Sequence, residues 1–433
     1  MQKGGENLNK EQLQLFKDCY NDFVINKNMH EKAKDYYKGK TDAMKEYKMI
    51  TSRSNNKCSV NYIKKFVKEE VSYCVGNPIN YISKSGNKSI VDDVDYYITS
   101  YWDHDYDAKC MKEMVLHGLA FEIYYLDNNL NFKSKVVDPC NGYVYEDDKG
   151  NVIFFMHTFT KKFDKNIYVD VYTKDCIYHF DNTFSKEITT ATPHIFGRVP
   201  VGVGRISDEE IFDTIFNDIY QLQNAYETNL SDISNEISDF RNAYLKVIGA
   251  KLDTEETSKM KESGILQMTE NGQIEWLIKN VNDTFIQNTL STIEDKMYQL
   301  TSHINHNEAM QSNVSGVALR SRLISLEQKC ILNQKAYANL VKTRLEMLFI
   351  FLKIKFNKNY DYRDIKIKFT PNIPQDDQAT AQIISQLGDK LSLETALSLL
   401  SFITNPSNEV EKIKAEQSEI LEGSKLLDGG LDE

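Results

Sequence analysis

Glycine and proline are missing from a long part of this 433-residue chain, with neither between residues 317 and 370. Because glycine costs about 1 kcal/mol and proline about 3 kcal/mol inside a helix, their absence permits one very long helix. At 1.5 Å per residue, a helix over 317–353 would be roughly 55 Å long. The apolar residues that recur mostly every three or four positions are Leu319, Leu323, Leu326, Cys330, Tyr337, Val341, Leu345, Leu348 and Leu352. They predict one buried stripe, on a helix that crosses between domains or packs against other subunits.

The chain also lacks an excess of positive charge, since its formal net charge is -11 and its pI is about 5.4. A protein that grips duplex DNA through its phosphates is basic at least locally, so the composition argues against tight nucleic-acid binding. It is compatible with a surface that lets DNA slide past. Basic residues do recur along the long stretch, at Arg320, Arg322, Lys329, Lys335, Lys342 and Arg344. They fit a solvated face, intersubunit salt bridges or a partial contact with a passing polyanion.

Paired cysteine motifs, targeting segments and membrane segments are absent as well. The seven cysteines are scattered with no zinc-ligand spacing, which argues against a structural zinc site and for reduced thiols in a cytosolic protein. The first residues contain no apolar signal region. The longest apolar patch, residues 347–352, is too short to span a bilayer. We therefore expect a protein made and used in the cytoplasm, without a membrane partner.

Motifs that carry catalysis or cofactors are also missing. There is no phosphate-binding loop, no dinucleotide-binding glycine motif after a strand and no nucleophile elbow. Gly202 and Gly204 precede a helical pattern and are interpreted as a turn. His303 and His306 have the spacing of one helix face but no further ligands nearby, and the acidic residues 146–148 lack the alternating spacing of a calcium loop. The sequence therefore predicts no catalytic residue, no cofactor and no metal.

The central part of the chain predicts two long helices around a small module. Residues 205–248 are mostly helical, with Ser207 as the N-terminal cap, and a second helix runs over about 282–304. Between them we expect a strand at 244–249, a short helix at 254–262, and a hairpin of 264–269 with 273–278 around an Asn-Gly turn. The pattern is that of two helices running to and from a compact tip.

The flanking parts are mixed. Before residue 200 we expect helices over 10–38, 61–74 and 91–116, then strands over 120–126, 133–138, 142–146, 152–160, 167–172 and 175–181. This is an α+β domain with an antiparallel sheet. After the long helix, residues 365–369 are predicted to form a strand that returns to that sheet. Helices are expected over 375–387, 392–403 and 407–421. The fold class is α+β, mainly helical.

Several local sequences, taken in order, resemble a known family. They are Tyr-Tyr-Lys-Gly at 36–39, the helix leading to Gly-Asn-Pro at 76–78, Gly-Leu-Ala-Phe-Glu at 118–122, Ser-Asp at 207–208 with Ser-Asp-Ile-Ser-Asn at 231–235, Ala-Tyr-Leu at 243–245, Ser-Gly-Val-Ala-Leu at 315–319, Phe-Thr-Pro-Asn-Ile-Pro at 369–374 and Leu-Ser-Leu-Glu-Thr at 391–395. Together with the element order, they resemble the portal proteins of tailed double-stranded DNA bacteriophages, of the type found in long-tailed phages of Gram-positive hosts. The segment around residues 84–89 is shorter than in that family, and the tail is brief.

The resemblance implies a division of the chain into named regions. They are an α+β wing (1–205), a first stem helix (206–243), a clip (244–281), a second stem helix (282–303), a tunnel loop (304–316), a long helix with a closing wing strand (317–370), and a helical crown with an acidic tail (371–433). It also implies sites. Contact with DNA is implied for the tunnel-loop residues Asn305, His306, Asn307, Glu308, Gln311, Ser312 and Asn313. The long helix would start at Ser315 and Gly316. Partner binding is implied for the clip residues Lys251, Asp253, Glu255, Glu256, Lys259, Glu270 and Asn271.

The function implied is that of a channel without enzymatic activity. A ring, usually of twelve subunits, would occupy one capsid vertex of the virion after assembly in the host cytoplasm. Its partners would be the terminase large subunit, a head–tail adaptor protein, the major capsid and scaffolding proteins, and double-stranded DNA that passes without sequence specificity. Two alternatives stay open from the residues alone: a helical adaptor or scaffold that binds one partner through the 244–281 tip, and a nuclease or hydrolase in the α+β body.

Overall fold

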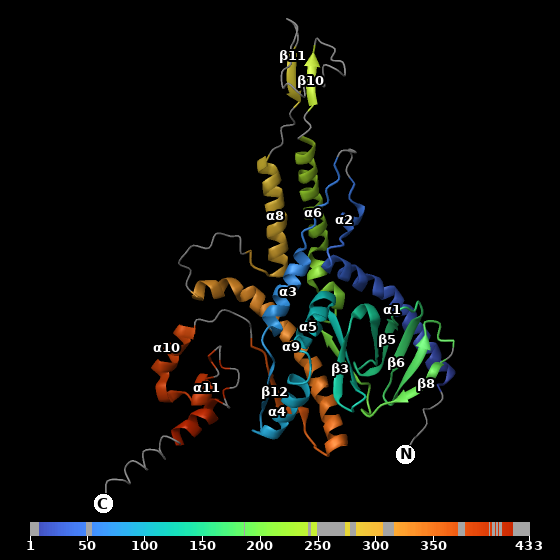
Figure 1. Ribbon diagram of the computed structural model, residues 1–433, viewed down its shortest axis with the longest axis vertical. Coiled ribbons are helices and arrows are strands. Elements are labelled where there is room, and N and C mark those ends of the chain that lie inside the picture. Colours follow the sequence, from blue (N-terminus) through green and yellow to red (C-terminus); the bar gives the residue numbers. More distant parts are fainter. Residues whose placement is uncertain are drawn as a thin grey trace, which may run out of the picture. The chain divides into compact units, whose positions relative to one another are not determined.

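A computed structural model gives the structure of the chain (Figure 1). It describes residues 8–48, 54–185, 187–240, 244–248, 273–277, 283–305, 316–370, 377–397, 399–400, 403, 406 and 409–418. The chain divides into two compact units, one made of residues 1–312 and 321–372 and the other of 313–320 and 373–433.

The first unit contains the wing, the stem and most of the long helix. Its helices are α1 (Lys10–Tyr37), α2 (Asp42–Glu46), α3 (Tyr62–Val75), α4 (Lys88–Val94), α5 (Tyr106–His117), α6 (Ile215–Phe240), α8 (Asp283–Thr301) and α9 (Gly316–Phe356). Its strands are β1 (Asn80–Ser83), β2 (Leu119–Leu126), β3 (Phe132–Val137), β4 (Gly142–Glu146), β5 (Val152–Thr160), β6 (Ile167–Tyr172), β7 (Cys176–Asp181), β8 (Glu187–Pro193), β9 (Val201–Arg205), β10 (Tyr244–Ile248), β11 (Gln273–Leu277) and β12 (Ile365–Lys368). The α+β class predicted from the sequence is confirmed.

Besides the two-stranded sheet of β1 with β12, the described part of the wing contains two antiparallel sheets where one was predicted. Strands β4-β5-β6-β7-β8 form a five-stranded meander, and β3-β2-β9 form a separate three-stranded sheet. Strands β8 and β9 were not predicted, and the helix expected over 91–116 is divided, with a π-helical turn at Asp95–Thr99 and α5 starting at Tyr106. Helix α1 packs on the larger sheet, where Phe16 meets Phe154 at a ring-centroid distance of 4.8 Å.

The strand predicted at 365–369 exists but does not return to the wing sheet. As β12 it pairs antiparallel with β1, with Asn80 opposite Lys368 and Ser83 opposite Ile365. Likewise, the described partner of β11 is β10, with Tyr244 opposite Leu277. The predicted hairpin partner 264–269 and the helix 254–262 lie outside the described residues.

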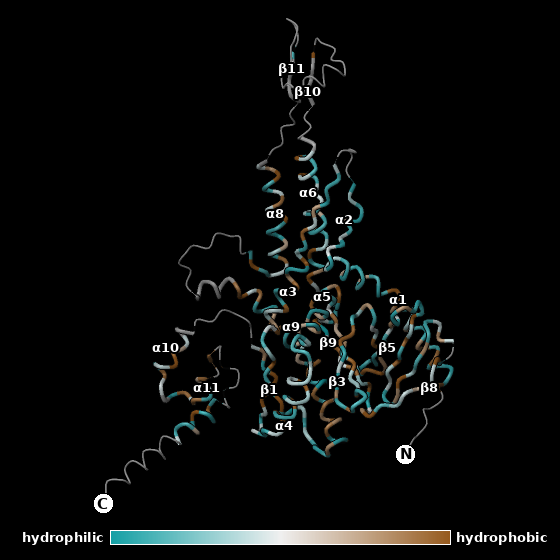
Figure 2. The backbone as a smooth tube through the Cα atoms, viewed as in Figure 1, coloured by the Kyte–Doolittle hydropathy of each residue, from teal (hydrophilic) through white to brown (hydrophobic). Residues whose placement is uncertain are grey.

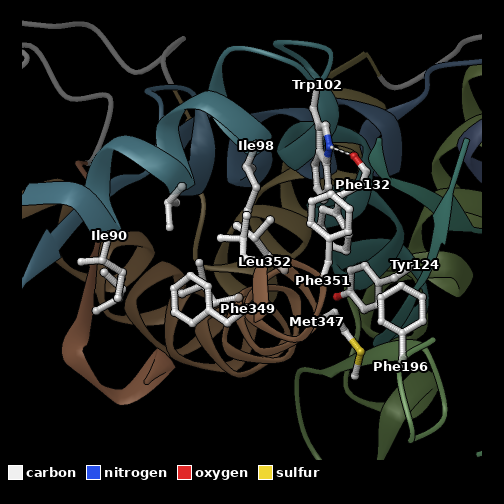
Figure 3. Close-up of a cluster of buried hydrophobic side chains, with 14 residues drawn as sticks. Ile90, Ile98, Trp102, Tyr124, Phe132, Phe196, Met347, Phe349, Phe351 and Leu352 are labelled. Atoms are coloured by element: carbon white, nitrogen blue, oxygen red, sulfur yellow. Dashed lines mark hydrogen bonds between the residues drawn. The ribbon is translucent and has the colours of Figure 1, made fainter. Parts of the chain in front are cut away.

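Helix α9 is longer than predicted, and its C-terminal half has a core within its own chain. Its 41 residues correspond to roughly 60 Å. Around Leu348 and Leu352 the helix is buried on several sides by α4, the segment after it, and β2 and β3 (Figure 3). Within this cluster Trp102 donates a hydrogen bond to the carbonyl of Phe132 at 3.4 Å. The single-stripe prediction is therefore wrong for this half, because its neighbours come from the wing.

The N-terminal half of α9 contacts α3 on one side but also displays apolar side chains. Ile324, Ile331 and Leu332 are 53%, 40% and 63% exposed. Here the prediction of a helix that needs another partner stays a prediction.

Gly202 and Gly204 lie in strand β9 and do not form a turn, so that interpretation is wrong. A Cβ at Gly202 would lie 2.4 Å from the Tyr124 hydroxyl, and one at Gly204 would lie 2.9 Å from Leu340 Cδ1 on α9. The two glycines therefore allow a tyrosine and the long helix to approach the strand closely.

The first stem helix starts later than the sequence indicated. Ser207 precedes a short 3-10 turn at Glu210–Phe212, and α6 begins at Ile215. The hydroxyl of Thr214 accepts a hydrogen bond from Asn217 N at 3.3 Å, which is the pattern of a helix cap. The cap prediction for Ser207 was wrong because Thr214, seven residues later, offers the same chemistry.

The second unit contains α10 (Asp377–Leu387), α11 (Leu393–Leu397) and a helical stretch over 409–418. These agree with the helices predicted for the tail, although α11 is shorter than expected.

Candidate functional site

Helices α6 and α8, which the resemblance predicts as the stem helices, run antiparallel and pack against each other (Figures 1 and 2). We keep the name stem for these two helices. Figure 2 shows hydrophobic and hydrophilic residues alternating along both helices. Tyr62 and Phe66 of α3 support the stem: the ring of Tyr62 lies 5.4 Å from that of Tyr226 on α6, and Phe66 lies 5.0 Å from Tyr298 on α8. Edge-to-face contacts of this kind add to the energy of burying aromatic rings. They join both stem helices to the wing.

A row of polar residues on α6 is buried. Gln223, Glu227, Ser231 and Asn235 are spaced four apart, so they share one helix face, and each is at most 1% exposed. They face residues 54–61, a segment with neither helix nor strand that we call the strap. Buried polar groups are costly unless they are hydrogen-bonded. The strap supplies those hydrogen bonds, so this row of residues attaches the strap to α6 at a defined position.

Glu227 is the centre of this attachment. Its carboxylate accepts from Ser59 Oγ at 3.0 Å, from the backbone N–H of Val60 at 3.0 Å and from Gln223 Nε2 at 2.9 Å. The hydroxyl of Thr41 also donates to it. One carboxylate thus holds the strap, the residue before α2 and its own helix together.

The other end of the row repeats the arrangement. Ser231 Oγ accepts from Cys58 N at 2.9 Å, and Asn235 accepts from Asn56 N at 2.6 Å while donating to the Asn56 carbonyl at 2.9 Å. The paired donor and acceptor of the Asn235 amide match those of a peptide unit. The strap is therefore bound along the first stem helix almost as a strand is bound in a sheet.

The end of the second stem helix is fixed by His303. Its ring stacks on Phe66 at 4.4 Å, and its two nitrogens lie 2.9 Å and 3.1 Å from the carbonyl oxygens of Thr301 and Phe66. Burial lowers the pKa of His303 to about 3, so the ring is neutral at pH 7 and donates to one of these carbonyls. His303 is a packing residue at the start of the tunnel loop.

The long helix is anchored in the wing by Arg344, which is fully buried. Its guanidinium bonds to Glu122 on β2, with one contact at 3.2 Å, and to Asp107 on α5 at 2.8 Å. Tyr337, seven residues or about two helical turns earlier on α9, donates a hydrogen bond from its hydroxyl to Asp107 at 2.7 Å. Burial opposes the charge, but the carboxylate of Glu122 raises the pKa of Arg344 above its usual value. The pair fixes the rotation of α9 against β2 and α5.

The basic residues of the long helix therefore do not form one surface. Arg344 is internal, and Lys329 pairs with the buried Glu70 at 2.7 Å. Lys342 is exposed, and its ammonium contacts Asn339 at 3.1 Å. The three interpretations given for these basic residues, namely a solvated face, an intersubunit salt bridge and a polyanion contact, are wrong for Lys329 and Arg344. Both residues form ion pairs within the chain. The side chains of Arg320 and Arg322 lie outside the described part.

A triad-like arrangement lies on the five-stranded sheet. His179 Nδ1 is 2.7 Å from Asp170 Oδ1, and His179 Nε2 is 3.0 Å from Thr192 Oγ1. The hydrogen bond to Asp170 raises the pKa of His179. Acyl transfer needs this order of groups, but also donors aimed at a developing oxyanion. Thr192 is exposed on β8, at the end of the sheet order, so we interpret the contacts as cross-strand pairing.

The structure places few of the site residues predicted from the sequence. Asn305 is described, four residues beyond the end of α8, and Gly316 is the first residue of α9. The remaining predicted tunnel-loop residues, Ser315 and all seven predicted clip residues lie outside the described residues, so these predictions stand as they were made. The strap contacts and Arg344 were missed. The four-residue spacing of polar groups on α6 was a sequence signal for the strap contacts. Arg344 and its partner Glu122 are 222 positions apart in the sequence, so no local pattern indicated their ion pair.

With this architecture described, the comparisons with known proteins give the class. The sequence profile of the family described as phage portal protein, SPP1 Gp6-like, matches residues 18–423. The chain belongs to this family of phage portal proteins. It is 22% identical over 450 residues to the portal protein of Bacillus phage SPP1, covering 95% of this chain and 86% of that relative.

Solved structures with a similar fold come from gene transfer agent (GTA) particles. A chain in the neck of an empty GTA particle, computed with C6 symmetry, overlaps with a TM-score of 0.48. One in the virion of a native gene transfer agent particle overlaps with 0.46. Each is 10% identical, and each overlap covers 78% of this chain and 88% of the other. Among the described helices of this chain, none has the length and apolar character needed to cross a membrane.

Proposed function

We propose that this chain forms a ring at one capsid vertex and that double-stranded DNA passes through its centre during packaging and ejection. The observation that carries the proposal is the family match over residues 18–423. In this role the protein is a channel and an assembly hub rather than an enzyme. Terminase would dock on it during packaging, and a head–tail adaptor would replace terminase later. Assembly of the ring, usually of twelve subunits in this family, would take place in the host cytoplasm with the scaffolding and major capsid proteins.

The charge of the stem suits a channel that does not retain DNA. Helix α6 carries Asp218, Glu227, Asp232, Glu236 and Asp239 and contains no lysine or arginine. Tight binding to phosphates requires lysine or arginine to release counterions from the DNA. Helix α8 adds one exposed lysine, Lys296, directly after Glu294 and Asp295, so the stem offers at most one such contact per subunit. The tunnel loop adds mainly Asn, Ser and Gln. DNA is therefore expected to slide past the stem and touch the loop through hydrogen bonds.

We infer that the exposed apolar residues of α9 belong to the interface between subunits of the ring. Ile324, Ile331 and Leu332 give the helix an apolar face, and in a ring the same patch can meet a different surface of the next copy. We infer that a neighbouring subunit covers it.

Leu332→Arg is expected to prevent closed rings while leaving the subunit folded, because an exposed position tolerates the change but an apolar interface does not accept an unpaired charge. Analytical ultracentrifugation and circular dichroism measure the two effects separately. The matched control is Phe163→Arg, since Phe163 is 97% exposed on the turn between β5 and β6. Normal rings from Leu332→Arg, or equal loss in both variants, would remove this face from the interface.

Replacing the clip distinguishes the portal hypothesis from the hypothesis of a simple adaptor. When a flexible Gly/Ser linker replaces residues 244–281, rings are expected to form but terminase-dependent packaging is expected to fail, since the proposed docking surface is gone. Electron microscopy checks the rings, and DNA protected from nuclease in a packaging reaction checks the activity. An adaptor that acts only through this tip would lose its single function and would show no rings with either version. Packaging at the normal level without the tip would contradict the proposed role of the clip.

A further inference from the structure

A buried cluster of nitrogen, oxygen and sulfur ligands lies in the wing. One ligand atom each from His117, Asp138 and Cys140 lies within 4.8 Å of the others. His117 ends α5, and Asp138 and Cys140 flank the first residue of the short turn after β3. His30 comes from α1, and its ring centroid lies 5.3 Å from that of His117, although it is not among the three residues whose ligand atoms lie within 4.8 Å of one another. Three ligand groups thus lie together, and a fourth imidazole from a separate segment lies beside them.

The two histidines have unused ligand capacity. His117 is completely buried, and neither of its ring nitrogens makes a hydrogen bond; the nearest carboxylate oxygen given for it is Glu113 Oε2, 3.4 Å from Nε2. His30 is 9% exposed, and its Nδ1 also has no hydrogen-bond partner. Buried imidazole nitrogens are normally paired.

The turn holds the other two ligands in place. Asp138 accepts a hydrogen bond from Cys140 N at 2.8 Å, which fixes the two side chains relative to each other. Lys34 also donates a hydrogen bond to the Asp138 carboxylate. An oxygen that accepts one hydrogen bond keeps a second lone pair.

We propose that His30, His117, Asp138 and Cys140 bind one zinc-class divalent cation that joins α1, α5 and the turn after β3. Four protein ligands of this mixed kind form closed tetrahedral sites that serve structure rather than catalysis. Ligand atoms around zinc lie about 3.3–3.6 Å apart, so the cluster has to contract by roughly 1 Å. Glu113 Oε2 lies 3.4 Å from Nε2 of His117, so it can orient this histidine as a ligand when Nδ1 is the nitrogen that binds the cation.

A metal-free account makes a different prediction. In it, His117 packs beside Glu113 and Asp138, whose Oδ1 lies 3.9 Å from Nε2, and Cys140 keeps its thiol proton. A cation bound at Cys140 would instead hold it as a coordinated thiolate. A thiolate signal therefore separates the two accounts.

The test uses full-length protein stripped with a chelator and titrated with cobalt(II) or zinc(II) alone. We expect one ion per subunit, visible tetrahedral cobalt bands with a thiolate-to-cobalt charge-transfer band, and a rise in the thermal midpoint on adding zinc. Cys140→Ser should remove the charge-transfer band and weaken zinc binding about tenfold or more. Matched controls are Cys176→Ser and His157→Gln, a buried thiol and a buried imidazole outside the cluster.

Wild-type protein whose cobalt spectrum has no thiolate band overturns the proposal without relying on any variant. So does zinc binding that is equally strong in wild type and Cys140→Ser. Ring formation is measured separately by ultracentrifugation, so failure of this proposal leaves the channel function untouched.

Discussion

Replacing Arg344 with methionine is expected to lower the free energy of unfolding by about 3–5 kcal/mol. The reason is the partner left behind: Glu122 is fully buried, and without the guanidinium its charge has no counterion among the contacts described for it. Tyr124 donates to the Glu122 carboxylate at 2.7 Å, but a single neutral donor does not replace an ion pair. The loss is read from urea unfolding followed by tryptophan fluorescence, since Trp102 lies 5.2 Å from the guanidinium.

Two further variants show that the effect arises from the ion pair. Arg344→Met with Glu122→Gln removes both charges and should recover part of the lost stability, because the orphaned carboxylate is the main cost. Lys342→Met changes an exposed cation two residues away on the same helix and should change stability by less than about 0.5 kcal/mol. If Arg344→Met unfolds at the wild-type urea concentration, the pair does not anchor α9.

The second large effect is expected at Glu227. Glu227→Leu removes the acceptor for Ser59, the Val60 N–H and Gln223, each of which would be left without that bond. A buried polar group that loses its partner costs about 1–3 kcal/mol, so the total for these three groups is roughly 3–9 kcal/mol unless the strap leaves the helix and regains water. Release of the strap is the less costly outcome, and we expect it.

Trypsin measures that release directly because Lys57 is exposed in the middle of the strap. Cleavage after Lys57 should become much faster in Glu227→Leu. Glu227→Gln keeps one acceptor oxygen and should be intermediate. Gln221→Leu, an exposed change on the same helix, should match wild type. Unchanged cleavage in Glu227→Leu would mean that Ser231 and Asn235 hold the strap without it.

Local patterns in the sequence predicted most elements of the wing. Strands β5 and β6 begin and end at the predicted residues, and β5 is buried on both faces, with Phe154 and Met156 in one hydrophobic cluster and Phe155 in another. Strand β8 was missed because Glu-Ile-Thr-Thr-Ala-Thr-Pro has little apolar alternation, as expected for a strand at the end of a sheet. Strand β9 was missed because its glycines suggested a turn, whereas they make room for Tyr124 and Leu340.

Interactions between distant segments could not be predicted in the same way. Glu227 lies in a sequence that predicted only an amphipathic helix. Its structural role depends on hydrogen bonds to the strap, 160 to 170 residues earlier in the chain. The same holds for the four ligands of the proposed cation site, which have no motif spacing because three different elements supply them. Family resemblance gave the order of regions but none of these contacts. The polar row at 223, 227, 231 and 235 was the one signal present in the sequence alone.

The central claim is that this chain closes into a ring, and the direct measurement is electron microscopy of the purified full-length protein with native mass spectrometry of the same sample. The account predicts closed particles with rotational symmetry and a central opening, with a mass that is a whole multiple of the 50.1 kDa subunit. A stable monomer at micromolar concentration, with no rings under any salt condition, would contradict it.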